Sequence, residues 1–172
     1  MLISNLMTVR AAFQGVIAVS TALAMSLAAL AIKPPVEPAP RFHATSMDGE
    51  KFSNESVKGK VVLLQFWATW CKYCRGDQAI VDELTQEFAD RGLVVLGVNV
   101  MESKKTVKKY LEQMPRACKI VLTDDTNLAA LYAAKSFPLY VLIDRDGNVA
   151  GMQKGAGGAT SLRRLLSKAG IE

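Results

Sequence analysis

The sequence predicts an α/β domain in which one layer of β-sheet lies between helices. Two apolar runs rich in β-branched residues, 61–67 and 93–100, are typical of buried strands. Between them, apolar residues recur at helical spacing over 77–88. A strand, a helix and a strand in this order predict a right-handed parallel crossover. Residues 139–143 and 149–152 flank a turn, and this hairpin gives the sheet an antiparallel end.

Shorter elements complete the predicted domain. Met47-Asp48-Gly49-Glu50 marks a turn between two short strands within residues 42–60. The remaining patterns predict a helix over 104–114 that stops before Pro115, a strand over 120–122, a short helix over 127–134 and an amphipathic helix over 159–169. No internal repeat interrupts this order, so we expect one domain.

The tetrad Cys71-Lys72-Tyr73-Cys74 lies where the central strand gives way to a helix. At such a corner, the unpaired N–H groups and the helix dipole favour a thiolate by about 0.3–2 kcal/mol. Cys71 is therefore the predicted nucleophile. Cys74, one turn further on, is placed to resolve a mixed disulfide, so the pair can cycle between dithiol and disulfide. Lys72 and Arg75 add positive charge nearby.

The tetrad has two other interpretations, a zinc site and a purely structural disulfide. A zinc site needs about four ligands, but the chain holds only one further cysteine, Cys118, and one histidine, His43, neither in a second paired motif. A purely structural disulfide that closes so short a loop adds little stability through chain entropy. The redox interpretation is therefore preferred to both. Cys118, near a short strand, is expected to be a small buried side chain.

The amino-terminal part of the chain predicts membrane targeting. Residues 1–10 form a short segment ahead of 11–32, a run of 22 residues without charge, and about 20 apolar residues span a bilayer. A cleavable signal peptide is the alternative, because Ala29-Leu30-Ala31 has the small-x-small form of a cleavage site. We expect an anchor, and both interpretations place the domain outside the cytoplasm.

Proline and lysine patterns define the rest of the organisation. Residues 33–40 hold four of the six prolines, which predicts an extended linker before a domain over 41–172. The formal net charge of +5 is small and dispersed, so no nucleic-acid partner is expected. The densest basic cluster, at helical spacing, is interpreted as a solvated helix face: Lys104, Lys105, Lys108 and Lys109.

Three motifs in order resemble the thioredoxin superfamily, and specifically its TlpA/ResA-like, membrane-tethered thiol–disulfide oxidoreductases of the bacterial cell envelope. They are Trp67-Ala68-Thr69-Trp70-Cys71-Lys72-Tyr73-Cys74-Arg75, then Phe137-Pro138, then Val141-Leu142-Ile143-Asp144-Arg145-Asp146-Gly147. The resemblance covers residues 42–172. It implies a thioredoxin-like fold, with a central mixed sheet flanked by helices, an N-terminal β-hairpin and a helix/strand insertion.

The resemblance also assigns roles around the dithiol. It implies that Pro138 follows a cis peptide bond and faces the cysteines, and that Phe137 contacts the partner polypeptide; the alternative is that Pro138 merely starts an edge strand. It implies a redox-site environment that also includes Trp67, Trp70, Lys72 and Tyr73. No cofactor and no metal is implied beyond the redox-active disulfide Cys71–Cys74.

The chain departs from the family pattern at three positions. Gln65 stands where thioredoxins proper have a buried acid, and an amide cannot titrate. Asp77 stands where ResA-like members have an acid, so it is a candidate for modulating dithiol protonation; the alternative is a first-turn acid favoured by the helix dipole. Ala79 replaces a common helix proline, which leaves a kink in this helix in doubt.

The preferred function is an extracytoplasmic thiol–disulfide oxidoreductase that acts on protein cysteines. The resemblance favours reduction, as in cytochrome c maturation, with substrate proteins and a membrane electron donor as partners. One alternative is a copper-binding or docking module, since copper(I) favours two thiolates. The other is a thiol peroxidase, which needs Pro-x-x-x-Thr-x-x-Cys, whereas Leu64 and Ala68 occupy those positions.

Overall fold

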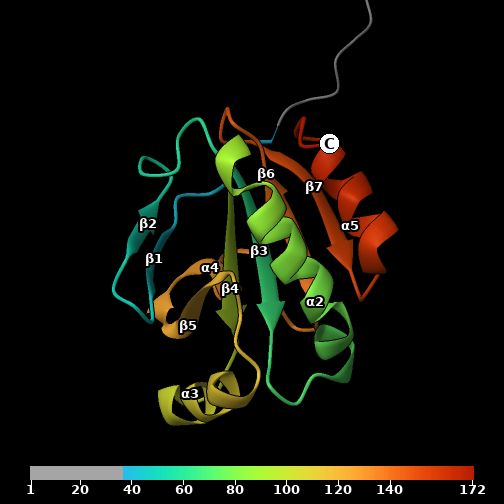
Figure 1. The fold of residues 1–172 in the computed structure, drawn as a ribbon. Coiled ribbons are helices and arrows are strands. Elements are labelled where there is room, and N and C mark those ends of the chain that lie inside the picture. Colours follow the sequence, from blue (N-terminus) through green and yellow to red (C-terminus); the bar gives the residue numbers. More distant parts are fainter. Residues whose placement is uncertain (1–36) are drawn as a thin grey trace, which may run out of the picture. The chain divides into compact units, whose positions relative to one another are not determined.

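A mixed sheet in the order β2-β1-β5-β4-β3-β6-β7 is the centre of the computed structural model, which describes residues 37–172 (Figure 1). Its strands are β1 (His43–Ser46), β2 (Lys51–Ser53), β3 (Val61–Trp67), β4 (Leu93–Asn99), β5 (Lys119–Thr126), β6 (Leu139–Ile143) and β7 (Val149–Lys154). The helical elements are α2 (Lys72–Glu87), η2 (Ala89–Arg91), α3 (Lys104–Gln113), α4 (Leu128–Leu131) and α5 (Gly158–Ser167).

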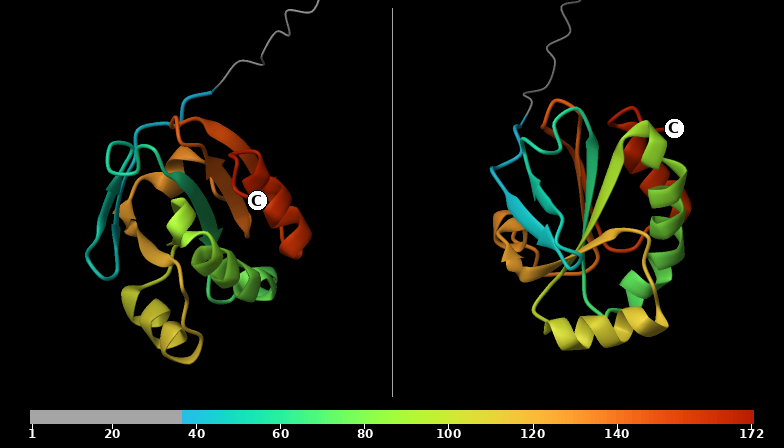
Figure 2. Two further views of the ribbon diagram at one scale, coloured as in Figure 1. Left: turned by 45° about the horizontal axis from the view of Figure 1, so that its top comes forward. Right: turned by 60° about the vertical axis from the view of Figure 1, so that its left-hand side comes forward.

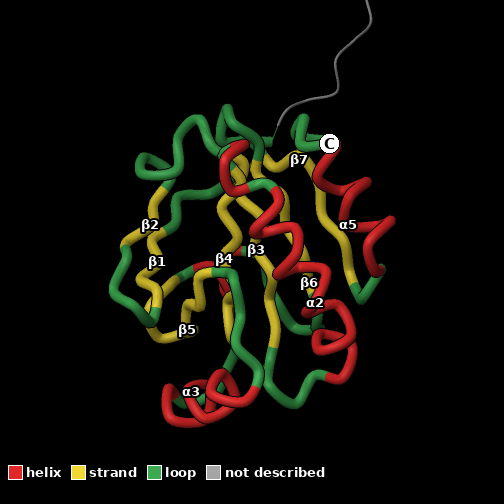
Figure 3. Tube along the Cα trace, in the orientation of Figure 1, coloured by secondary structure: helices red, strands yellow, loops and turns green. Residues whose placement is uncertain are grey.

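The sheet confirms the predicted parallel crossover and antiparallel end. β3 pairs in parallel with β4, and β4 with β5, whereas β6 and β7 run antiparallel on the other side of β3. The predicted N-terminal hairpin is the antiparallel pair β1–β2. Helices α2 and α5 lie on one face of the sheet and α4 on the other (Figure 2), so the strands form the middle layer (Figure 3).

β3 organises the core because every one of its side chains is buried. Alternate residues point to opposite faces of a strand. Val61, Leu63 and Trp67 join the core under α2 and α5, while Val62 and Leu64 join the core on the face of α4. A central strand of this kind has no solvent face, which accounts for its continuous apolar sequence.

Two elements differ most in length from the prediction. β5 runs on to Thr126 because its second half pairs with the N-terminal hairpin, Thr126 lying opposite Ala44 of β1. Such a long-range partner leaves no local pattern in the sequence. The predicted helix over 127–134 shortens to α4 because Ala133 adopts a left-handed φ of 45°, a conformation that ends a helix.

The membrane-anchor prediction for residues 11–32 and the segment 1–10 lie outside the described residues. Within 37–172, no helix has the length and apolar character needed to cross a bilayer. The described end of the proline-rich linker packs on the domain instead of standing clear of it. The Val149 N–H donates to the carbonyl of Glu37 at 2.9 Å, and the Ala39 N–H donates to that of Gly147 at 2.9 Å.

Candidate redox site

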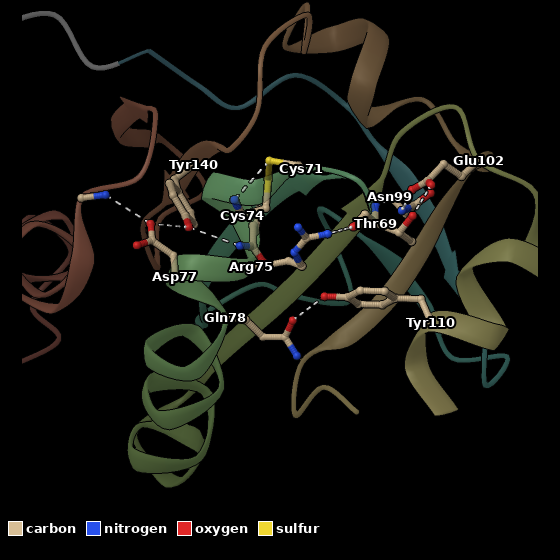
Figure 4. Close-up of a disulfide and its surroundings, with 12 residues drawn as sticks. Thr69, Cys71, Cys74, Arg75, Asp77, Gln78, Asn99, Glu102, Tyr110 and Tyr140 are labelled. Atoms are coloured by element: carbon tan, nitrogen blue, oxygen red, sulfur yellow. Dashed lines mark hydrogen bonds between the residues drawn. A yellow bond between two sulfur atoms is a disulfide. The ribbon is translucent and has the colours of Figure 1, made fainter. Parts of the chain in front are cut away.

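The cysteine pair lies at the junction of β3 and α2, as the sequence predicts. Cys71 is the N-cap of α2, and its Sγ accepts a hydrogen bond from the Cys74 N–H at 3.1 Å. The two sulfurs form a disulfide with an S–S distance of 2.06 Å (Figure 4). The first-turn N–H group therefore points at the sulfur of Cys71, which is the contact that stabilises a thiolate after reduction.

The turn before Cys71 is held by a residue that sequence reasoning did not single out. Glu102 follows the end of β4, and its carboxylate accepts the Thr69 N–H at 2.7 Å and the Thr69 hydroxyl at 2.5 Å. The Asn99 amide donates to the same carboxylate at 2.7 Å. β3 and β4 are parallel neighbours, so their carboxyl ends meet here. The sequence signal that could have identified Glu102 is an acidic residue just after the second of two adjacent parallel strands.

Exposed aromatic side chains surround the disulfide. Trp70 is 66 % exposed and Tyr73 is 70 % exposed, which is unusual for side chains of this size. The Trp70 ring meets Phe137 edge-on, with 6.0 Å between ring centroids. The hollow beside the disulfide, hereafter the active-site hollow, is lined by Trp70, Cys71, Lys72, Tyr73, Lys135, Ser136 and Phe137. Cys71 lines it and Cys74 does not.

The Phe137–Pro138 peptide bond is cis, as the resemblance implies. Pro138 precedes β6, and β6 lies between β3 and β7. The alternative, in which Pro138 starts an edge strand, is therefore wrong. The Pro138 carbonyl accepts a hydrogen bond from the Gly155 N–H at 2.8 Å, which ties this loop to the segment after β7.

Trp67 differs from the other aromatic residues expected around the dithiol. It is 1 % exposed and belongs to the core under α2. Its ring lies 5.5 Å from that of Tyr110 and 5.4 Å from the guanidinium carbon of Arg116. Trp67 therefore supports the site from beneath and does not line the active-site hollow.

Asp77 lies deeper than a first-turn acid. α2 begins at Lys72, which puts Asp77 in the second turn, and its side chain is buried at 4 % exposure. Its carboxylate accepts hydrogen bonds from the Tyr140 hydroxyl at 3.0 Å and from the N–H groups of Gly157 at 3.2 Å and Gly158 at 3.1 Å. The alternative of a simple helix-start acid is therefore wrong.

A buried polar group connects Asp77 to the centre of the sheet. Gln65 donates from Nε2 to the Tyr140 hydroxyl at 3.2 Å and accepts at Oε1 from Arg116 at 2.9 Å. Arg116 also donates to Asp82 on α2 at 3.1 Å. Burial, with a contribution from nearby Asp77, raises the pKa of Tyr140. Tyr140 and Arg116 escaped sequence reasoning because each lies far along the chain from the cysteines.

The remaining predictions concern Cys118, Ala79 and the lysine cluster on α3. Cys118 is a free, buried cysteine, as expected, and burial raises the pKa of its thiol. It packs where β4 has Gly97; a Cβ at that glycine would lie 3.1 Å from the Cys118 sulfur. α2 is one continuous helix through Ala79. The predicted lysine cluster on α3 is exposed to solvent.

The AhpC/TSA family model matches residues 35–152. The chain belongs to this family. It is 31 % identical over 111 residues to the thiol-disulfide oxidoreductase ResA of Bacillus cereus, a match that covers 64 % of each chain. It is 35 % identical over 120 residues to the thioredoxin-like protein YneN of Bacillus subtilis, covering 68 % of this chain and 69 % of that one. The chain thus spans just under two thirds of the first relative's length.

Solved structures agree with the fold. A thiol:disulfide interchange protein of the thioredoxin family from Chlorobium tepidum is 28 % identical with a TM-score of 0.70, covering 80 % of this chain and 98 % of that one. StoA from Bacillus subtilis has a TM-score of 0.64 at 20 % identity, covering 74 % and 97 %, and shows the fold alone. These matches confirm the predicted thioredoxin-like fold.

Proposed function

We propose that this protein is an extracytoplasmic thiol–disulfide oxidoreductase that reduces disulfides of protein substrates through Cys71 and Cys74. The observation that carries the proposal is the position of Cys71, which caps α2, is joined to Cys74 and is the cysteine that lines the active-site hollow. An attacking sulfur must be accessible, and its thiolate must be stabilised. Cys71 is only 5 % exposed, but it lines the active-site hollow, and its sulfur accepts the Cys74 N–H. The redox centre is the cysteine pair itself, with no external cofactor.

The catalytic cycle starts from the reduced dithiol. The Cys71 thiolate attacks one sulfur of a substrate disulfide, forms a mixed disulfide and releases the other substrate sulfur as a thiolate. The thiolate of Cys74 then attacks the Cys71 sulfur, which restores the Cys71–Cys74 disulfide and releases the second substrate thiol. Two electrons and the two dithiol protons pass to the substrate. A donor dithiol, which we place in the membrane, returns the pair to the reduced form.

Substrate binding is assigned to the rim of the active-site hollow. Trp70 and the half-buried Phe137 meet edge-on and offer apolar surface beside the Cys71 sulfur, and Tyr73 adds an exposed ring. Aromatic side chains of this kind give large contact area at low entropic cost. The backbone beside Pro138 is proposed to pair with an extended substrate segment, and Lys72 adds positive charge.

Localisation outside the cytoplasm is proposed from the uncharged segment 11–32, acting as an anchor, with a signal peptide as the alternative. Maturation of cytochrome c or a similar process involving exported thiols is the proposed context.

A peroxidase role is disfavoured because Leu64 and Ala68 are buried apolar residues where that chemistry needs proline and threonine. Within residues 37–172, no group of three or more metal-ligating side chains gathers.

Trapping of mixed disulfides tests the proposal. Cys74→Ser should accumulate disulfide-linked complexes with substrate proteins through Cys71, whereas Cys71→Ser should neither turn over nor trap. Cys118→Ser is the matched control, because it removes a buried thiol outside the disulfide and should keep parental activity. Complexes trapped through Cys74 would reverse the two roles, and the absence of complexes with either variant would exclude the function.

The equilibrium potential of the Cys71–Cys74 couple tests the direction of electron flow. A reducing role requires a potential nearer to the about −270 mV of thioredoxin than to the about −120 mV of DsbA. Equilibration with dithiothreitol or glutathione buffers, followed by alkylation and mass spectrometry of the 71–74 peptide, gives this value. A potential near that of DsbA would leave thiol–disulfide exchange intact and make the protein an oxidant.

A further inference from the structure

A chain of buried polar side chains runs across β3 and β6 beneath α2 and ends on Asp77. Arg116, with a side chain 1 % exposed, donates to Gln65 Oε1 at 2.9 Å. Gln65 Nε2 donates to Tyr140 Oη at 3.2 Å. The Tyr140 hydroxyl donates to Asp77 Oδ2 at 3.0 Å (Figure 4). Gln65 and Tyr140 are fully buried and lie directly opposite each other in the β3–β6 register.

Arg116 determines the direction of this chain. A guanidinium group carries only donors, so the atom of Gln65 that faces it must be the carbonyl oxygen. The reversed amide would bring two donors together. The NH₂ group of Gln65 consequently points at Tyr140 and occupies its oxygen as an acceptor. A phenol has one hydrogen, and the only direction left for that of Tyr140 is toward Asp77.

Every partner of the Asp77 carboxylate in this set is therefore a hydrogen-bond donor. Besides the Tyr140 hydroxyl, its carboxylate accepts the N–H groups of Gly157, the N-cap of α5, and of Gly158, the first residue of α5. Burial by itself favours a neutral carboxyl group, whereas donated hydrogen bonds favour the carboxylate. A protonated Asp77 would need an acceptor, and none of these three groups provides one.

We propose that Arg116 and Tyr140 are positioning residues of the redox site, which act through Gln65 to hold Asp77 as a carboxylate one helical turn from Cys74. Residues three apart on a helix are neighbours on its surface, so a fixed negative charge there disfavours the thiolates of the reduced pair. The inference rests on the proposed function of that pair. It assigns to this buried chain the proton control that Gln65 alone cannot provide.

The direction in which each variant shifts the thiolate equilibrium of Cys71 distinguishes this hydrogen-bonded mechanism from a simple effect of nearby charge. Loss of the Asp77 charge favours the Cys71 thiolate, whereas loss of the Arg116 charge by itself disfavours it. Tyr140→Phe changes no charge at neutral pH, so its effect reports the hydrogen bond to Asp77. The other charged or titratable groups around the site are unchanged by it: Lys72, Arg75, Asp82, Glu102, Tyr110, Cys118 and Lys135.

The test is the pH profile of Cys71 alkylation in the reduced full-length chain. Iodoacetamide rates are measured from about pH 5 to 10, and modification at Cys71 is quantified by mass spectrometry. Tyr140→Phe and Asp77→Asn should each lower the midpoint by about half a unit or more. In the Asp77→Asn background, Tyr140→Phe should cause no further shift, because the two residues then act through one interaction.

Two further variants complete the design. Tyr132→Phe is the matched control, because the Tyr132 hydroxyl has no hydrogen-bond partner within the described residues and its ring packs against the opposite face of the sheet; its profile should overlay the parent. Arg116→Met removes a positive charge, which should raise the midpoint of Cys71 alkylation. In the parent, the same variant also releases the fixed direction of the hydrogen bonds to Asp77, and this opposes the rise. In the Tyr140→Phe background that opposing effect is absent, so the rise should be larger. If Arg116→Met fails to fold, Arg116→Lys replaces it; because it keeps the charge and has fewer donors, it should lower the midpoint in the parent and leave it unchanged in the Tyr140→Phe background.

Specific results would overturn the proposal. They are a Tyr140→Phe profile that overlays the parent, a Tyr140→Phe shift that persists in Asp77→Asn, or an equal Arg116 effect in both backgrounds. Circular dichroism and urea unfolding confirm that each variant is folded. The proposed function fails separately if the parent does not reduce a protein disulfide such as that of insulin, because alkylation rates do not depend on turnover.

Discussion

The carboxylate of Glu102 accepts both the backbone N–H and the side-chain hydroxyl of Thr69, two residues before the predicted nucleophile. The contact joins the end of β4 to the turn between β3 and α2. The Arg75 guanidinium also donates to the Thr69 carbonyl at 3.1 Å. Cys71 thus follows a turn whose polar groups are fixed from two sides, which limits the positions its sulfur can take.

Removal of this contact should loosen the turn. Glu102→Ala leaves the Thr69 N–H and the Asn99 amide without their acceptor, so we expect the free energy of unfolding to fall by about 1–3 kcal/mol and disulfide reduction to slow several-fold. Glu102→Gln keeps one acceptor oxygen and should lose less. Glu112→Ala, at an exposed acid on α3, is the control. Urea unfolding and an insulin-reduction assay measure both effects; parental values for Glu102→Ala would contradict the structural role.

Gly97 permits close packing between β4 and its neighbours. A Cβ there would lie 3.1 Å from the Cys118 sulfur and from Ile120 Cδ1, and 3.3 Å from Trp67 Nε1. Gly97→Ala should therefore cost about 1–3 kcal/mol of unfolding free energy through overpacking. Cys118→Ala removes the sulfur, so the double variant should be more stable than the sum of the two single changes predicts. Strictly additive urea-unfolding energies would show that the sulfur does not cause the strain.

Tyr132 should make the protein sensitive to alkaline pH. Burial is the main cause that raises its pKa to about 12 from 10.0. The folded state keeps the neutral hydroxyl, while the unfolded chain loses the proton near pH 10. This contribution to stability is fully present below pH 10 and is lost as pH rises toward 12, by up to about 2 kcal/mol.

Tyr132→Phe should remove this contribution to the alkaline pH dependence of stability. At pH 7 we expect the free energy of unfolding of the variant to match or exceed that of the parent, because the hydroxyl has no partner within the described residues. Between pH 10 and 12 the variant should become more stable relative to the parent. Urea unfolding of the oxidised protein at pH 7, 9 and 11 measures the difference. Tyr73→Phe, at an exposed position, should follow the parent throughout. A constant Tyr132→Phe difference would show that this tyrosine titrates alike in both states.

Lysine charge at the active-site hollow should favour acidic substrates. Lys72 and Lys135 line the hollow, no acidic side chain does, and neither lysine forms an ion pair within residues 37–172. Lys135→Glu should raise KM a few-fold for a peptide disulfide flanked by aspartates, and lower it for a lysine-flanked peptide. Lys108→Glu on α3 is the charge-matched control, and equal KM values for Lys135→Glu and the parent would refute the preference.

The sequence by itself determined the features that depend on neighbouring residues. The Cys-x-x-Cys tetrad at the start of α2 is visible because apolar strand and helix patterns flank it directly. The parallel pair β3–β4 follows from the order of strand, helix and strand. The identity of Cys118 as a buried thiol could also be judged locally, from its place beside a short strand.

Only the tertiary structure decided how distant polar residues meet. Glu102 reaches Thr69 across parallel strand ends, and Tyr140 meets Asp77 because β6 lies beside β3 under α2. Arg116 is polar by type yet buried, since Gln65 and Asp82 accept its hydrogen bonds. No local pattern records such contacts, because their energy depends on partners that the chain brings together only after folding.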